Sequence, residues 1–150
     1  MPARRRLLAA ASASLALAAL TGCEKPAPLV TLVSGGTSVY TEANAYCFEE
    51  GKTLEDGGCA ERAQGATRLE VRPGEQVSVD VDKDLVERGW RVQLGTGDEP
   101  DNVSRVFDDQ HYFTFEAPGL PPEGAPLTVS TVDEQDATTG RWLFLLVPKD

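Results

Sequence analysis

The feature that most constrains the fold is a series of short segments in which apolar and polar residues alternate. In residues 77–81 a valine stands at every second position, and in residues 90–94 apolar side chains again alternate with polar ones. A period of two places one set of side chains on one face of a strand. Apart from one turn of helix expected around residues 82–88, no segment shows a convincing amphipathic helical pattern. The chain therefore predicts half-buried antiparallel strands.

Nine segments are strand candidates. They are residues 29–33, 37–41, 68–71, 77–81, 90–94, 103–107, 111–116, 127–132 and 141–147. Turn residues separate them at 34–36, 72–75, 95–102, 108–110, the four-proline stretch 118–126 and 133–140. Residues 34–36 form either a hairpin turn or a kink within one strand. The run 141–147 is apolar on both faces, which predicts a central strand that is covered on both sides.

Seven to nine short strands without a convincing helix predict an all-β domain. The expected architecture is an immunoglobulin-like antiparallel β-sandwich, with a small β-barrel as the alternative. Trp90 follows the valine-rich strand at about the distance of the core tryptophan on the third immunoglobulin strand. The Cys…Trp…Cys order of true immunoglobulin domains is absent, because Cys47 and Cys59 both precede Trp90.

Residues 42–67 are rich in glutamate and glycine and have weak periodicity, so we expect a surface excursion that includes a short helical turn. Cys47 and Cys59 lie within it. In an oxidising compartment this even pair predicts one disulfide, with two free thiols as the alternative. A metal site is not expected, because the spacing is not Cys-x-x-Cys and His111 is the chain's single histidine.

The first 22 residues have the three-part layout of a secretory signal. Basic residues 4–6 precede an apolar run at 7–19, which is shorter than the roughly 20 residues that span a bilayer. Leu-Thr-Gly-Cys at 20–23 is the pattern of a bacterial lipoprotein processing site, so we expect cleavage before Cys23 and attachment of diacylglyceryl and palmitate-type chains to that residue. The alternative is an ordinary secretory signal with Cys23 as an unmodified thiol.

This processing would define the domain organisation. Residues 1–22 are a cleaved signal peptide, residues 23–28 a lipidated N-terminus with a short linker, and residues 29–150 a single domain on the outer, extracytoplasmic face of the cell membrane. Cleavage would remove three arginines and no acidic residue, leaving 11 basic against 24 acidic side chains, a net charge of −13. Such a charge repels phosphate backbones, so nucleic acid is not an expected partner.

Few residue patterns suggest chemistry. Asp80, Asp82 and Asp84 resemble the beginning of a calcium loop, but the glycine and the terminal glutamate of that loop are missing. The acidic stretch 98–101 would be at most a weak cation site. His111 lacks a nucleophile motif around it, and Gly-Thr-Gly at 95–97 lacks the lysine of a phosphate loop. We therefore expect neither catalytic residues nor a cofactor or metal.

Aromatic residues are dense in two of the predicted strands. Tyr112, Phe113 and Phe115 lie in one, and Trp142 and Phe144 in the other. We expect these strands to be neighbours. Core packing is the favoured interpretation, and a ligand-binding groove is the alternative.

Several short motifs occur in a particular order along nearly the whole chain. These are the sequence 20–31 around Cys23, the two spaced cysteines, Arg-Pro-Gly-Glu-Gln-Val at 72–77, Glu-Arg-Gly-Trp-Arg-Val at 87–92 and Gly-Arg-Trp-Leu-Phe at 140–144. In this order they resemble the actinobacterial lipoproteins called domain of unknown function 2771. The resemblance implies a surface lipoprotein acylated at Cys23, and it carries no activity to transfer.

The expected function is a membrane-anchored, non-enzymatic binding module with an envelope or secreted partner. One alternative is a tethered inhibitor of secreted enzymes that presents the loops 95–102 or 118–126. A less favoured alternative is an envelope hydrolase that uses a pair of carboxylates, although no pair stands out among the 24 acidic residues.

Overall fold

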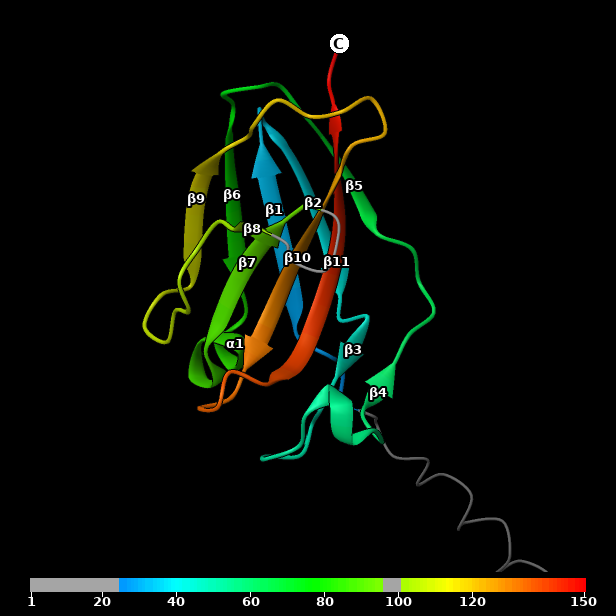
Figure 1. Ribbon diagram of the computed structural model, residues 1–150, viewed down its shortest axis with the longest axis vertical. Helices are drawn as coiled ribbons and strands as arrows, with labels where there is room; N and C mark the ends of the chain where they lie inside the picture. The colour runs from blue at the N-terminus through cyan, green and yellow to red at the C-terminus, as the bar shows by residue number, and fades with distance from the viewer. Residues whose placement is uncertain (1–24, 96–100) are drawn as a thin grey trace, which may run out of the picture.

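The computed structural model describes residues 25–95 and 101–150, which form two β-sheets packed face to face (Figure 1). The first sheet has the order β2-β1-β6-β9, with bounds Thr37–Glu42, Leu29–Ser34, Gln76–Val81 and Tyr112–Glu116. The second has the order β4-β3-β11-β10-β7-β8, with bounds Ala60–Glu61, Ala45–Tyr46, Thr138–Pro148, Ala125–Val132, Trp90–Leu94 and Asp101–Asn102. Strand β5 (Thr67–Val71) pairs with β11, and the described chain adds a helix α1 (Lys83–Arg88) and a 3-10 turn η1 (Leu54–Asp56).

The core lies between the sheets, where the alternating apolar positions meet. Val77 and Val79 of β6 enter it from one side, and Trp142 and Phe144 of β11 from the other, and all four are fully buried. Burial of this apolar surface is the main stabilising contribution to such a fold. The two sheets remain separate, so the predicted β-sandwich is confirmed.

Strand neighbours follow the immunoglobulin order. The β6–β9 pair corresponds to strands B and E of that fold, and the β7-β10-β11 set to strands C, F and G. Trp90, which is fully buried, begins β7 at the third-strand position predicted for it. In the described chain eight strands have five or more residues, within the predicted seven to nine, while β3, β4 and β8 have two each.

The first two strands form a hairpin. Ser34 pairs with Thr37, and Gly35 and Gly36 between them have φ values of 52° and 79°. Positive φ at both central residues is what a two-residue turn of type I′ requires. The sequence left open a hairpin or a kinked strand, and the structure shows the hairpin.

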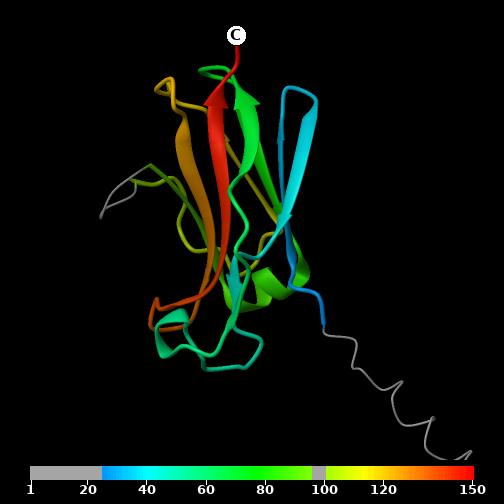
Figure 2. The same cartoon turned by 90° about the vertical axis from the view of Figure 1, so that its right-hand side faces the viewer.

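The expectation that the strands around residues 72–75 are wholly antiparallel is wrong in one respect. β5 runs parallel to β11 in one sheet, whereas β6 lies between β1 and β9 in the other. The turn at 72–75 therefore carries the chain from one sheet to the other, stabilised by the Glu75 carboxylate, which accepts a hydrogen bond from the Arg72 amide at 2.9 Å. Figure 2 shows β5 between β11 and the β1–β2 hairpin, where it closes this side of the sandwich.

The strand predicted at 103–107 does not form. Only Phe107 makes an isolated bridge, with Trp90. The Ser104 hydroxyl accepts a hydrogen bond from the Val92 amide at 2.8 Å. In a regular strand pair a backbone carbonyl would accept this bond, so the side chain replaces one bond of the ladder. The predicted strand at 141–147 is confirmed as central, because β11 lies between β10 on one side and β3 and β5 on the other. The expected cover on both faces is wrong, because Arg141 is exposed and Leu143 and Leu145 are only half-buried.

The structure contains the disulfide between Cys47 and Cys59 within the predicted excursion. The excursion is shorter than expected, because residues 43–47 are buried and contribute β3 to the second sheet. The expected helical turn is η1. Its first turn is fixed by the Asp56 carboxylate, which accepts hydrogen bonds from the Thr53 amide and hydroxyl, each at 2.9 Å.

Candidate functional site

The site begins with the segment 25–29, which is fastened to the folded domain at three points. The Lys25 ammonium pairs with the Asp84 carboxylate at 2.9 Å, and the Leu29 amide donates to the Asp82 carboxylate at 2.7 Å. Trp142 Nε1 donates to the Pro28 carbonyl at 2.9 Å in a buried position. The segment is therefore bound to the domain at Asp82, at α1 and at the core residue Trp142.

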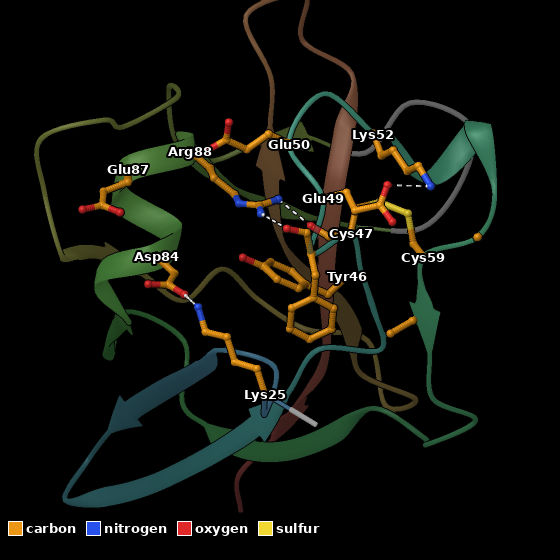
Figure 3. A pocket seen from close by; sticks show the side chains of 13 residues that line it. Lys25, Tyr46, Cys47, Glu49, Glu50, Lys52, Cys59, Asp84, Glu87 and Arg88 are labelled. Carbon is orange, nitrogen blue, oxygen red and sulfur yellow. Dashed lines mark hydrogen bonds and ion pairs between the residues drawn. A yellow bond between two sulfur atoms is a disulfide. The ribbon is translucent and has the colours of Figure 1, made fainter. Parts of the chain in front are cut away.

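A pocket of about 820 Å³ opens beside this segment (Figure 3). Its walls come from three parts of the chain: the N-terminal segment with Lys25, the β3 end and excursion with residues 46–52 and the disulfide, and one face of α1. We call this the tether-end pocket, after the N-terminal segment 25–29 that forms one of its walls. The disulfide and the short helix hold the second and third walls, so the pocket is built on fixed elements.

Arg88, the last residue of α1, joins two of these walls. Its guanidinium lies 4.7 Å from the ring centre of Tyr46, within the range of a cation–π contact. Its Nη1 donates to the Cys47 carbonyl at 2.6 Å and its Nη2 to the Phe48 carbonyl at 3.3 Å. The arginine therefore fixes the excursion against the helix, and Gly89, with φ of 85°, ends the helix directly after it.

Aromatic side chains form the apolar part of the pocket. Tyr46 contacts Phe48 edge to face at 5.0 Å between ring centres, and Trp142 at 5.8 Å. Phe48 remains 38% exposed at the rim. Burial raises the pKa of the Tyr46 hydroxyl, and the nearby Arg88 charge opposes that shift. The phenol therefore stays protonated at physiological pH.

The charges around the pocket nearly cancel. Lys25, Lys52 and Arg88 face four carboxylates among the lining residues, and two of these carboxylates are paired with the lysines. The hydrogen bond and charge of Asp84 raise the pKa of Lys25, which keeps it cationic. On a strongly acidic domain this end is therefore close to neutral, and its mixture of paired charges and aromatic rings suits a polar or zwitterionic ligand.

One known protein family matches most of the chain. The family model described as "Protein of unknown function (DUF2771)" matches residues 23–137. The chain belongs to this family. The match begins at Cys23 and includes every residue that lines the tether-end pocket. No curated protein matches the chain.

In this DUF2771 member the three aspartates of the calcium-like pattern do not converge. Asp82 and Asp84 bind the segment 25–29, as described above, and Asp80 is exposed on the outer face of β6. Within residues 25–95 and 101–150, no three His, Cys, Asp or Glu side chains are grouped so as to hold a metal ion. Of the second acidic stretch, residues 98 and 99 lie outside the described chain.

The remaining sequence candidates are dispersed in the DUF2771 domain. His111 is exposed directly before β9, with its Nδ1 3.4 Å from the Val81 carbonyl. The prediction that the two aromatic strands are neighbours is wrong, because β9 and β11 lie in different sheets. Trp142 and Phe144 are core residues, as the favoured interpretation held, whereas Tyr112 points outward and is 65% exposed. Cys23 lies outside the described residues.

No helix in the described part of the chain is long and apolar enough to cross a membrane. The tether-end pocket itself was not found from the sequence. Its residues come from segments that are far apart. Arg88 stands in the motif at 87–92, but that motif does not show that the side chain binds the excursion.

Proposed function

We propose that this DUF2771 protein is an extracytoplasmic lipoprotein, acylated at Cys23, whose single domain is a non-enzymatic binding module. The observation that carries the proposal is the docking of the segment 25–29 onto the domain. Only Glu24 separates the acylated residue from Lys25. Two residues span at most about 7 Å, so a lipid at Cys23 would hold the tether-end pocket at the membrane surface.

Three further features support this location. Residues 1–22 have the layout of a secretory signal, and the family match begins at Cys23. The disulfide between Cys47 and Cys59 is typical of a protein folded outside the cytoplasm. A pocket held this close to a bilayer would meet ligands at or in the membrane, such as a lipid headgroup region or the exposed part of a membrane protein.

Processing is tested by expressing the full chain and its Cys23→Ser variant in a bacterium that matures lipoproteins. We expect the wild type in the membrane fraction, with mass spectrometry showing a diacylated N-terminal cysteine. We expect the variant to lack that modification. An unmodified wild-type N-terminus, or wild-type protein retained in the cytosol, would contradict the location.

Binding is tested separately by placing a photocrosslinking phenylalanine analogue at Phe48 in intact cells. Tyr40, which is 69% exposed on β2 and does not line the pocket, is the matched aromatic control position. We expect a membrane component to be crosslinked from position 48 and not from position 40. Identical products from both positions would show that the pocket has no special role.

The inhibitor and hydrolase alternatives stay hypotheses. The tether-end pocket has carboxylates, but Asp84, Glu49 and Glu87 are each engaged in an ion pair with a lysine. No contact among the described residues favours either alternative.

A further inference from the structure

Strand β9 is an open edge of the first sheet. It pairs with β6, and no other described strand pairs with it. In Figure 1 it lies at the margin of the molecule, on the side opposite β5. The open edge is on a different surface from the tether-end pocket, so this inference goes beyond the proposed function.

The backbone groups on this edge can be assigned from the ladder. The Ala117 amide donates to Glu75 and the Val81 amide to the His111 carbonyl, so odd-numbered residues of this strand turn their backbone groups toward β6. The alternation of an antiparallel ladder then directs the N–H and C=O groups of Tyr112, Thr114 and Glu116 away from the sheet. These form a row of donors and acceptors for another strand.

Several common protections of an edge are missing within β9. Natural edges carry proline, lysine or a bulge that blocks pairing with another chain. Tyr-Phe-Thr-Phe-Glu at 112–116 contains neither proline nor lysine, and its register with β6 has no shift. The edge is therefore competent to accept a strand.

Side chains at the same edge are incompletely covered. Phe113 and Phe115 point toward the core but are only partly buried, whereas the β6 residues opposite them, Val79 and Val77, are fully buried. A strand added beside β9 would cover both phenylalanine rings with its inward side chains. Backbone pairing and apolar burial would then act together.

The charges near β9 indicate what kind of strand can be added to it. A second copy paired about Thr114 would place Glu116 opposite Tyr112 of the other copy, and Asp80 flanks the same Tyr112 from β6 on the outer face. Each processed copy would also carry a net charge of −13. Self-association is therefore opposed electrostatically, whereas a basic segment is attracted.

We infer that β9 binds an extended segment of a cationic partner protein by strand addition. Apolar residues at alternate positions of this segment cover Phe113 and Phe115. Lysine or arginine at the intervening positions faces Asp80 and Glu116.

The probe is a nine-residue peptide of alternating lysine and valine, added to the full chain in a neutral detergent. The control peptide replaces each lysine with glutamate. Amide hydrogen exchange resolved by residue is the measurement. We expect the lysine peptide to slow exchange of the Tyr112, Thr114 and Glu116 amides at least tenfold, and the glutamate peptide to leave them unchanged.

Thr114→Pro removes an outward N–H and places a ring on the open edge without breaking the ladder to β6. We expect it to weaken peptide binding at least tenfold. Thr114→Val is the matched control: it keeps the N–H, loses the same hydroxyl contact with Ser78, and should bind within twofold of wild type. Should Thr114→Pro fail to fold, Tyr112→Pro removes another outward N–H at the first strand residue.

Three results would overturn the inference. One is unchanged exchange of the three amides at millimolar lysine peptide. Another is equal binding by the folded proline variant or by the glutamate peptide. The third is concentration-dependent protection of the same amides without peptide, which would make a second copy the occupant.

Discussion

Replacing Trp142 by phenylalanine should release the segment 25–29 from the domain while the sandwich stays folded. The indole is fully buried, and its Nε1 donates to the Pro28 carbonyl at 2.9 Å. Phenylalanine keeps an aromatic ring in the core but has no donor. The buried Pro28 carbonyl would then have lost its partner.

The magnitude follows from two contributions. A buried carbonyl left without a donor costs about 1–3 kcal/mol. Removing three heavy atoms from a fully buried position costs roughly 2 kcal/mol more, at about 0.8 kcal/mol per methylene-sized group. Only the first contribution acts locally on the segment 25–29, and at about 1.4 kcal/mol per factor of ten it should accelerate local opening by roughly 5- to 150-fold.

The assay is amide hydrogen exchange at Leu29, whose N–H donates to Asp82. Trp90→Phe is the matched control, because Trp90 is also fully buried and its Nε1 donates to the Gln110 carbonyl at 2.8 Å. Both variants should lose similar free energy of unfolding in urea. Only Trp142→Phe should accelerate Leu29 exchange, and equal acceleration in both variants would refute the reasoning.

Three other predictions concern the same end of the domain. Replacing both Cys47 and Cys59 by serine should lower the free energy of unfolding by roughly 3 kcal/mol, measured in urea, because the bond closes a loop with a sequence separation of 12. The absorbance difference between wild type and Tyr46→Phe during alkaline titration should appear above the ordinary tyrosine value of about 10. Burial raises the pKa of Tyr46, so the folded protein holds the phenol proton more tightly than the unfolded chain does. The resulting contribution to the free energy of unfolding is fully present below the ordinary tyrosine pKa of about 10, and it is lost as pH rises through the folded-state pKa. Gly140→Ala should destabilise the domain by about 1–3 kcal/mol in the same urea assay, because its Cβ would lie 2.6 Å from Thr131 Oγ1 and 2.8 Å from Tyr46 Cδ2.

The sandwich could be predicted because its signals are local. Alternation in residues 77–81 and 90–94 defines which side chains face the core, and β6 and β7 form there. The pairing of strands is less accessible. The partner of β5 is β11, more than 70 residues later, and nothing in residues 67–71 indicates that their neighbour is parallel and distant. Ser104 likewise takes a ladder position by its side chain, which composition does not show.

The site was harder to predict than the fold. Asp82 and Asp84 stand out in the sequence as part of a spaced acidic pattern that begins like a calcium loop, although the rest of that loop is missing and no metal was expected. In the structure each binds the segment 25–29, one through the Leu29 amide and one through Lys25. The spacing of the carboxylates can be seen in the sequence, but the groups that they bind lie more than 50 residues earlier in the chain. Contacts at such separation leave no periodic trace in a single sequence.

Electrostatics suggests why a tethered acidic domain would fix its N-terminal segment. A body with a net charge of −13 near an anionic membrane is repelled within the Debye length of about 8 Å. On a flexible tether, that repulsion would determine how the domain is oriented relative to the membrane. The contacts made by Lys25, Pro28 and Leu29 instead hold the near-neutral tether-end pocket toward the anchor. The proposed anchor at Cys23 then lies at most about 7 Å from Lys25, which lines the pocket, whereas the acidic β9 edge lies on a different surface of the domain.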